Sequence, residues 1–172
     1  MDTIHLSDWG KVIPTVECLI TYKDEVLLQK RSPTSKKFPN YWIGPGGHVD
    51  STEDFLTAAI RETMEETGVV VKESEIKLRS VAIGRHEDRQ EVYMALFFLV
   101  KLNQKPKISS SDEGNNKWMP ISKAVKLRKI FPPFAYYIKH ALNKNKGIMY
   151  TNLKFKELKL IEESSIKIDQ DF

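Results

Sequence analysis

Three glutamates within five positions are the residues of this chain best placed to do chemistry together. They belong to residues 47–69, which read GHVDSTEDFLTAAIRETMEETGV. If a helix runs from about residue 53 to residue 67, a rotation of about 100° per residue places Glu62, Glu65 and Glu66 within one arc. Clustered carboxylates repel one another, and a hard cation such as Mg²⁺ or Mn²⁺, which prefers oxygen ligands, would relieve that repulsion. The spacing therefore predicts a metal-binding helix face.

Signals at both ends of this segment agree with a helix. Ser51 and Thr52 are candidate N-caps, with Asp54 three residues after Ser51 in an approximate capping box. Gly68 follows the last helical position, where a left-handed C-terminal cap is expected. The alternative is an ordinary surface helix whose glutamates are only solvated. Arg61 and the flanking glycines favour the metal-binding interpretation, because an ordinary surface helix does not need them.

The full spacing is glycine, five residues, glutamate, seven residues and then REUxEExGU, where U is apolar. It is met by Gly47, Glu53, Arg61, Glu62, Glu65, Glu66, Gly68 and Val69. Chance agreement at all of these positions is remote, and the segment resembles the Nudix box, the signature of the Nudix hydrolase family. Over about residues 12–143, the resemblance implies an α/β protein, a Nudix-type α/β/α sandwich with a mixed sheet. It also implies metal-dependent hydrolysis of a nucleoside diphosphate linked to another moiety.

The resemblance assigns a role to each matching residue. The implied ligands of Mg²⁺ or Mn²⁺ are the carbonyl of Gly46 and the side chains of Glu62, Glu65 and Glu66. Glu53 and Arg61 correspond to a pair that supports catalysis by fixing the box loop against its helix. Losing either member should weaken metal placement rather than abolish the fold.

A further glutamate follows in the run SDEGNNKW. Glu113 lies five residues before Trp118, where MutT-type members of the family carry such a residue. The resemblance implies that its carboxylate binds metal or activates water, and the alternative is a solvated loop acid. As the base that orients or deprotonates the attacking water, Glu62 is our first candidate and Glu113 our second.

Five residues outside the box glutamates are candidate substrate contacts. Arg31, Phe38 and Trp42 precede the box, so a cation and two aromatic rings could hold phosphate and base. His48 follows the glycine pair and could touch phosphate, and Arg85 lies in a polar run. The alternatives are hairpin packing for the first three and a structural role for His48 and Arg85.

Two classes of function remain open. The first is a nucleotide pyrophosphohydrolase, MutT-like on nucleoside triphosphates including oxidised ones, with nucleotide sugars or dinucleoside polyphosphates as competing substrates. The second is a non-catalytic module that senses a nucleotide in the same pocket. The survival of all the box acids favours the enzyme.

The length, composition and charge of the chain limit its domain organisation, its partners and its location. The 172 residues, 41% hydrophobic, suit one globular domain; we assign residues 1–146 to the Nudix hydrolase domain and residues 147–172 to a C-terminal extension that could belong to the same domain. The single Cys18 excludes an internal disulfide framework. A net charge of +4 suits a nucleotide or another diphosphate-containing small molecule, whereas no nucleic-acid-binding motif appears. Without a leader or membrane-length stretch, we expect a cytoplasmic protein with no membrane partner.

The elements that must position these residues can be read coarsely from the patterns. Strands are predicted at residues 12–22, 25–31, 76–83 and 92–102, the first two as a hairpin and the last as a central strand. The run GRHEDRQ is a predicted polar loop. A short strand leads into a helix near Pro120, and residues 134–144 predict another helix. The tail from residue 147 is left open as a terminal hairpin, a homodimer arm or a frayed segment.

Overall fold

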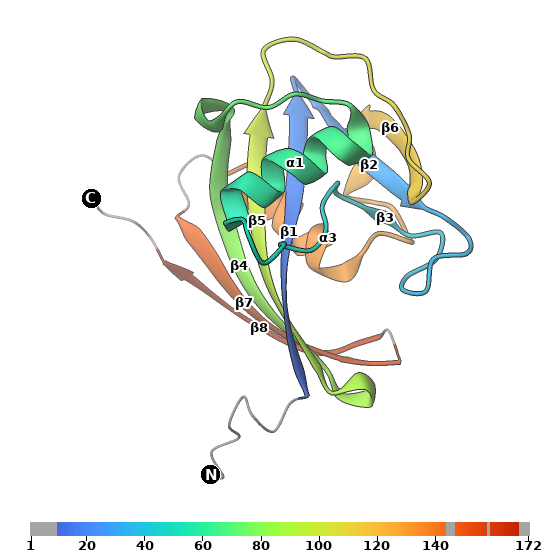
Figure 1. The fold of residues 1–172 in the computed structure, drawn as a ribbon, viewed down its shortest axis with the longest axis vertical. Helices are drawn as coiled ribbons and strands as arrows, with labels where there is room; N and C mark the ends of the chain where they lie inside the picture. The colour runs from blue at the N-terminus through green and yellow to red at the C-terminus, as the bar shows by residue number, and fades with distance from the viewer. Residues whose placement is uncertain (1–9, 144–146, 158, 169–172) are drawn as a thin grey trace.

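A computed structural model describes residues 10–143, 147–157 and 159–168 of the chain (Figure 1). Its elements, in chain order, are β1 (Lys11–Tyr22), β2 (Glu25–Arg31), β3 (Trp42–Ile43), α1 (Phe55–Thr67), the 3-10 turn η2 (Glu73–Glu75), β4 (Ile76–His86), the 3-10 turn η3 (Glu87–Arg89), β5 (Glu91–Lys101), β6 (Gly114–Pro120), α2 (Ile121–Ala124), α3 (Pro132–Ala141), β7 (Ile148–Lys156) and β8 (Lys159–Ile168).

The strands in these described ranges form one mixed eight-stranded sheet. Its order is β3-β2-β1-β5-β4-β7-β8, with β6 paired to β2. Strands β1 and β5 are parallel, as are β4 and β7, whereas β1 and β2 form the predicted antiparallel hairpin. Strand β5 is central, as its apolar sequence indicated, because it pairs with β1 on one side and β4 on the other.

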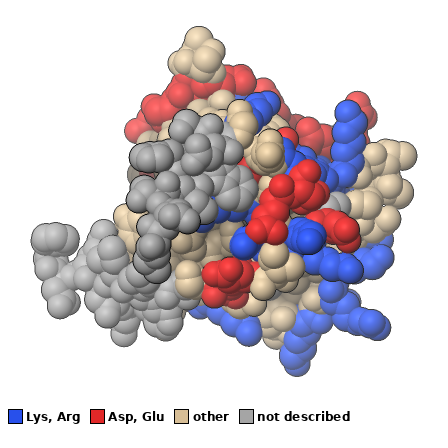
Figure 2. Space-filling view, turned by 90° about the horizontal axis from the view of Figure 1, so that it is seen from below, with Lys and Arg blue, Asp and Glu red and all other residues tan. Residues whose placement is uncertain are grey.

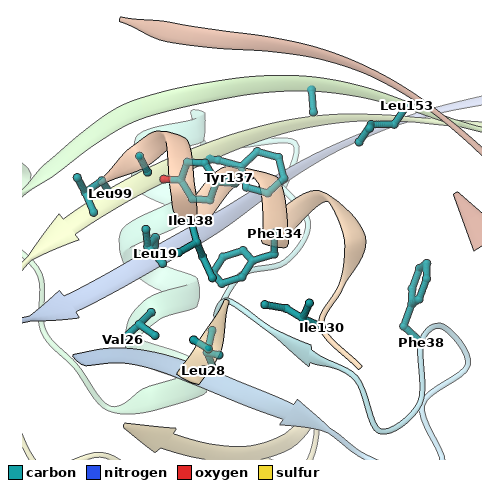
Figure 3. Close-up of a cluster of buried hydrophobic side chains, with 14 of the residues drawn as sticks. Leu19, Val26, Leu28, Phe38, Leu99, Ile130, Phe134, Tyr137, Ile138 and Leu153 are labelled. Carbon is teal, nitrogen blue, oxygen red and sulfur yellow. The ribbon is translucent and has the colours of Figure 1, made fainter. Parts of the chain in front are cut away.

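Helices cover both faces of the sheet, which confirms the predicted α/β/α sandwich (Figure 1). On one face, Ala58 and Ala59 of α1 pack with Cys18 and Ile20 of β1 in a buried apolar cluster. On the other face, α3 packs on the opposite side of the same strands. Figure 3 shows this second cluster, in which the α3 residues Phe134, Tyr137 and Ile138 meet Leu19, Val26 and Leu28.

The start of helix α1 differs from the prediction. Asp54, not Ser51 or Thr52, is the N-cap, because its carboxylate accepts hydrogen bonds from the backbone N–H groups of Leu56 and Thr57 at 2.8 and 2.9 Å. A carboxylate there satisfies two otherwise unpaired donors and opposes the positive end of the helix. The other end is as predicted, since Gly68 caps it in the left-handed conformation with φ 73°.

The end of β4 and the extents of α2 and α3 also differ from the prediction. The predicted polar loop GRHEDRQ begins in β4, which continues to His86 because residues Gly84 to His86 pair with both β5 and β7. The helix predicted near Pro120 is a single turn, α2, and the longer helix α3 begins at Pro132 rather than after the prolines. A first helical turn accepts proline because its N–H groups have no partner in the helix.

The tail forms a hairpin within the described residues. Strand β7 pairs along β4, and β8 pairs with β7, so the hairpin extends the main sheet. The division at residue 146 and the homodimer arm stay predictions. In the parts of the chain that the structure describes, no helix combines the length and apolar character needed to cross a membrane.

Candidate active site

The loop before helix α1 lies against the half of β1 that β2 leaves free. The backbone N–H of Cys18 donates to the Pro45 carbonyl at 2.7 Å, and that of Val16 donates to the Gly47 carbonyl at 2.9 Å. A Cβ atom on Gly46 would lie 2.2 Å from the Val16 carbonyl oxygen, so only glycine permits this approach. The loop is therefore fixed to a central strand, directly beside the acidic helix face.

Arg61 joins the acids of the box. Its Nη1 donates to Glu62 and to Glu65, both at 2.9 Å, while its Nε and Nη2 donate to the two oxygens of Glu53 at 3.0 and 2.5 Å. Nη2 also donates to the carbonyl of His48 at 3.1 Å. One guanidinium thus holds three carboxylates and the box loop together, which limits the repulsion between the acids.

The third box glutamate, unlike the other two, is buried. Glu66 is 5% exposed and accepts a hydrogen bond from the backbone N–H of Gly46 at 2.8 Å. Loss of water, reinforced by the negative charges of Glu113 and Glu62, raises the pKa of Glu66 to about 8. Burial also raises the pKa of Glu62 above its ordinary value, although Arg61 opposes this. A cation at this point would stabilise the ionised form of both acids.

The residues of the box fit a divalent cation. In the described part of the chain, no three ligating side chains meet at one point. Glu62 and Glu65 instead contact Arg61. The donors are all oxygens, however, and the buried Glu66 faces two like charges that a hard cation would neutralise. Glu62, Glu65, Glu66 and the Gly46 carbonyl are therefore the groups that would hold it.

Glu113 lies beside these acids although it is distant in sequence. Its backbone carbonyl accepts from the N–H of Ser32 at 2.9 Å, which ties the loop before β6 to the end of β2. Its exposed carboxylate is close enough to raise the pKa of both Glu62 and Glu66. The structure thus brings Glu113 to the box, where it could supply an additional oxygen ligand.

A cavity of about 190 Å³ opens beside the box loop on the α3 face of the sheet. Of the predicted substrate contacts, Arg31, Phe38 and His48 line it. Trp42 and Arg85 do not. Trp42 packs against the core cluster under α3, and Arg85 hydrogen-bonds an asparagine side chain on β7. Both expectations came from proximity in sequence, which does not show the direction in which a strand side chain points.

Glu17 is a cavity residue that the sequence reasoning missed. It is 6% exposed, and its carboxylate accepts from the backbone N–H of Gly44 at 3.1 Å. Burial raises its pKa well above the ordinary value. The available signal was its charge, since Glu17 is the one charged residue between Lys11 and Lys23. A buried acid of this kind often marks a site.

Comparison with known proteins identifies the family. Residues 11–142 match the family model of the NUDIX domain, and because this is most of the chain, the protein belongs to the Nudix family. The structure of a MutT protein from Bacillus halodurans has a TM-score of 0.76 and 21% identity, covering 89% of this chain and 97% of that one. At this identity the likeness shows the fold. Nudix hydrolases are pyrophosphohydrolases that generally need divalent metal ions.

Sequence relatives act on different substrates. The m7GpppN-mRNA hydrolase NUDT17 of Danio rerio is 41% identical over 59 residues, which are 34% of this chain and 20% of the relative. The asymmetrical bis(5'-nucleosyl)-tetraphosphatase of Caenorhabditis elegans is 33% identical over 103 residues, 59% of this chain and 71% of the relative. The chain thus spans about a fifth of the first relative and most of the second.

Glu53 should give the stability of the metal-free protein a measurable pH dependence. Its hydrogen bonds with Arg61 lower its pKa from 4.5 to about 2. A depressed pKa stabilises the folded state above pH 4.5, and this contribution is lost as pH falls toward 2. We expect Glu53→Gln to be less stable than wild type at pH 6, with a difference that shrinks below pH 4.5. Urea unfolding of both proteins at several pH values measures it; a constant difference would contradict the ion pair's role.

Proposed function

We propose that this protein is a metal-dependent pyrophosphohydrolase that cleaves a nucleoside diphosphate linked to another moiety. The observation that carries the proposal is the arrangement of Glu62, Glu65 and Glu66 beside Gly46, at the edge of a cavity with aromatic walls. A charged end beside an apolar end suits a molecule that joins phosphates to an organic group. All the box acids are present, which favours an enzyme over a non-catalytic nucleotide sensor.

The proposed metal ligands are the oxygens of Glu62, Glu65, Glu66 and the Gly46 carbonyl, with Glu113 as an additional ligand. Mg²⁺ or Mn²⁺ bound there would neutralise charge on the diphosphate. Arg61 keeps Glu62 and Glu65 next to each other. Glu53 in turn orients Arg61, and its Oε1 accepts from the backbone N–H of Asp50 at 2.9 Å.

Glu62 is the proposed base. It accepts a proton from a water molecule whose oxygen forms a new bond to phosphorus, while the bridging P–O bond opposite breaks and the leaving group takes its electron pair. Burial raises the pKa of Glu62, which makes the carboxylate a stronger base than an exposed glutamate. Glu113 is the second candidate for this role. If Glu62→Gln retained near-normal turnover, the assignment to Glu62 would be wrong.

The first substrate class is nucleoside triphosphates, including oxidised ones, as in MutT-type enzymes. The C. elegans tetraphosphatase favours a second class, dinucleoside tetraphosphates, because it is matched over most of its length. Small molecules suit the surface better than nucleic acid does. The part of the surface coloured by residue type in Figure 2 mixes acidic with basic side chains.

The test is hydrolysis of a substrate panel with Mg²⁺ or Mn²⁺. The panel contains nucleoside triphosphates, oxidised nucleotides, diadenosine tetraphosphate and nucleotide sugars, with products separated by chromatography. We expect turnover of at least one class and its loss in Glu65→Gln. The matched control is Glu73→Gln, an exposed glutamate on the turn η2 outside the box. Nucleotide binding without turnover on any substrate would replace the enzyme with the sensing module.

A further inference from the structure

The cavity continues past the box loop to the C-terminal hairpin. Leu153 and Phe155 of β7 line its far side, and both lie beyond the residues matched by the family model. In Figure 3, Leu153 and Phe38 lie at the same end of the buried cluster, away from Val26 and Leu28. The hairpin therefore supplies a wall of the substrate cavity that the family signature does not include.

Small residues form the floor of the cavity. Ala82 and Gly84 on β4 lie beside Ala95 and Tyr93 on β5, since the register pairs Ala82 with Ala95 and Gly84 with Tyr93. Around this floor stand the rings of Phe38, Phe131 and Phe155. The volume of about 190 Å³ is far more than one buried water needs. The space lies over small side chains and is bordered by aromatic rings, which suits a planar ring.

One polar atom in this apolar region lacks a partner. His86 is 6% exposed, and its Nδ1 has no hydrogen-bond partner among the described residues. Its ring stacks on Phe155, with centroids 4.7 Å apart and planes 9° apart, and meets Tyr93 edge-on at 5.2 Å. The imidazole is thus held in place by two rings at the cavity wall. A buried polar atom without a partner costs stability unless a ligand or water satisfies it.

Among the described residues that line the cavity, Arg31 and Lys37 carry the positive charges. Lys37 lies over the ring of Tyr93, which in turn contacts His86, but this cation is already paired with Glu91. Arg31 Nε donates to the Lys37 carbonyl at 3.1 Å, and Lys37 Nζ pairs with Glu91 at 3.3 Å and contacts the hydroxyl of Tyr93. Two cations, one of them already paired with a carboxylate, offer too little positive charge for a ring that carries many phosphates. The far end instead suits an uncharged ring with a few polar atoms.

We propose that Phe155 and His86 select the organic group of the substrate, a nucleobase, with Phe155 packing against the base and His86 Nδ1 hydrogen-bonding it. The C-terminal hairpin is then part of the specificity site. This inference rests on the proposed function and names the residues that bind the base of its substrate. It excludes substrates that present only phosphates or a sugar ring to this end of the cavity.

Equilibrium binding tests the inference without turnover. The probes are AMP and GMP, with ribose 5-phosphate as the base-free control, measured by calorimetry on the full chain without added metal. We expect wild type to bind at least one nucleotide about tenfold or more tightly than ribose 5-phosphate. Phe155→Leu keeps an apolar side chain, and His86→Phe keeps a stacked ring but removes Nδ1. Each should lose about fivefold or more of nucleotide affinity while ribose 5-phosphate binding stays unchanged.

Tyr150→Leu is the matched control, because Tyr150 is an exposed aromatic residue on β7 that does not line the cavity. Thermal melts establish that each variant is folded. Equal affinity of wild type for nucleotide and ribose 5-phosphate would overturn the inference, as would unchanged nucleotide affinity in both cavity variants. A different outcome would overturn the proposed function but not this inference. In that outcome, nucleotide binding depends on Phe155 and His86, but no diphosphate is hydrolysed with Mg²⁺ or Mn²⁺.

Discussion

Glu66→Gln should lower kcat by more than about a hundredfold and yet stabilise the metal-free protein at high pH. Mutation of a residue that only supports metal ligands typically lowers activity about 10–100-fold. Loss of a ligand itself should lower kcat at least as much. Glutamine keeps an oxygen that can accept from the Gly46 N–H, which the carboxylate does at 2.8 Å. It removes the negative charge that the cation requires.

The gain in stability follows from the raised pKa of Glu66. Its pKa of about 8 in the folded protein exceeds the ordinary 4.5, so ionisation destabilises the folded state as pH rises between these values. Glutamine does not ionise. The variant should therefore match wild type most closely below pH 4.5 and exceed it most above pH 8. A chain of this size gains about 2–4 °C in Tm per kcal/mol.

Thermal melts with and without Mg²⁺, at pH 5, 7 and 9, measure both effects. Wild type should gain Tm with the cation at pH 7 and above, and Glu66→Gln should not. Glu73→Gln is again the control for loss of one surface carboxylate. Full activity of Glu66→Gln, or a Tm gain on adding Mg²⁺ equal to that of wild type, would remove Glu66 from the proposed ligand set.

Gly46→Ala should destabilise the protein by about 1–3 kcal/mol and greatly reduce turnover. The added Cβ would lie 2.2 Å from the Val16 carbonyl oxygen and 2.8 Å from the Glu17 Cα. Both are backbone atoms of β1, whose pairing with β5 from Lys11 to Thr21 resists displacement. The loop must move instead, and it would carry away the N–H that binds Glu66 and the carbonyl proposed as a metal ligand.

Gly10→Ala is the matched control, because its Cβ would lie 3.6 Å from the nearest atom, the Gln90 carbonyl oxygen. Urea unfolding and steady-state kinetics compare the two variants with wild type. We expect Gly10→Ala to retain the unfolding midpoint and kcat of wild type. An unchanged midpoint for Gly46→Ala would mean that the box loop is not held against β1 as the structure has it.

The local sequence pattern was sufficient to predict the acidic helix and the neighbouring strands. Three glutamates at helical spacing and the cap Gly68 predicted helix α1, because a helix fixes the relative directions of nearby side chains. The alternation in residues 12–22 and the turn expected at Asp24 predicted the β1–β2 hairpin, because both are local signals. Where several local signals competed, prediction was less successful. The sequence indicated Ser51 or Thr52 as the cap of α1, whereas the folded helix is capped by Asp54.

The sequence alone determined the family, the box and its acids, because these depend on spacing along one short segment. Tertiary structure decided everything that depends on which distant strands lie side by side. It brought Glu113 to the box and buried Glu17 beside the cavity, and it turned Trp42 and Arg85 away. It also joined the tail to β4, which placed Phe155 against His86. Strand pairing between residues some seventy positions apart leaves no local periodicity, so only the folded chain reveals such neighbours.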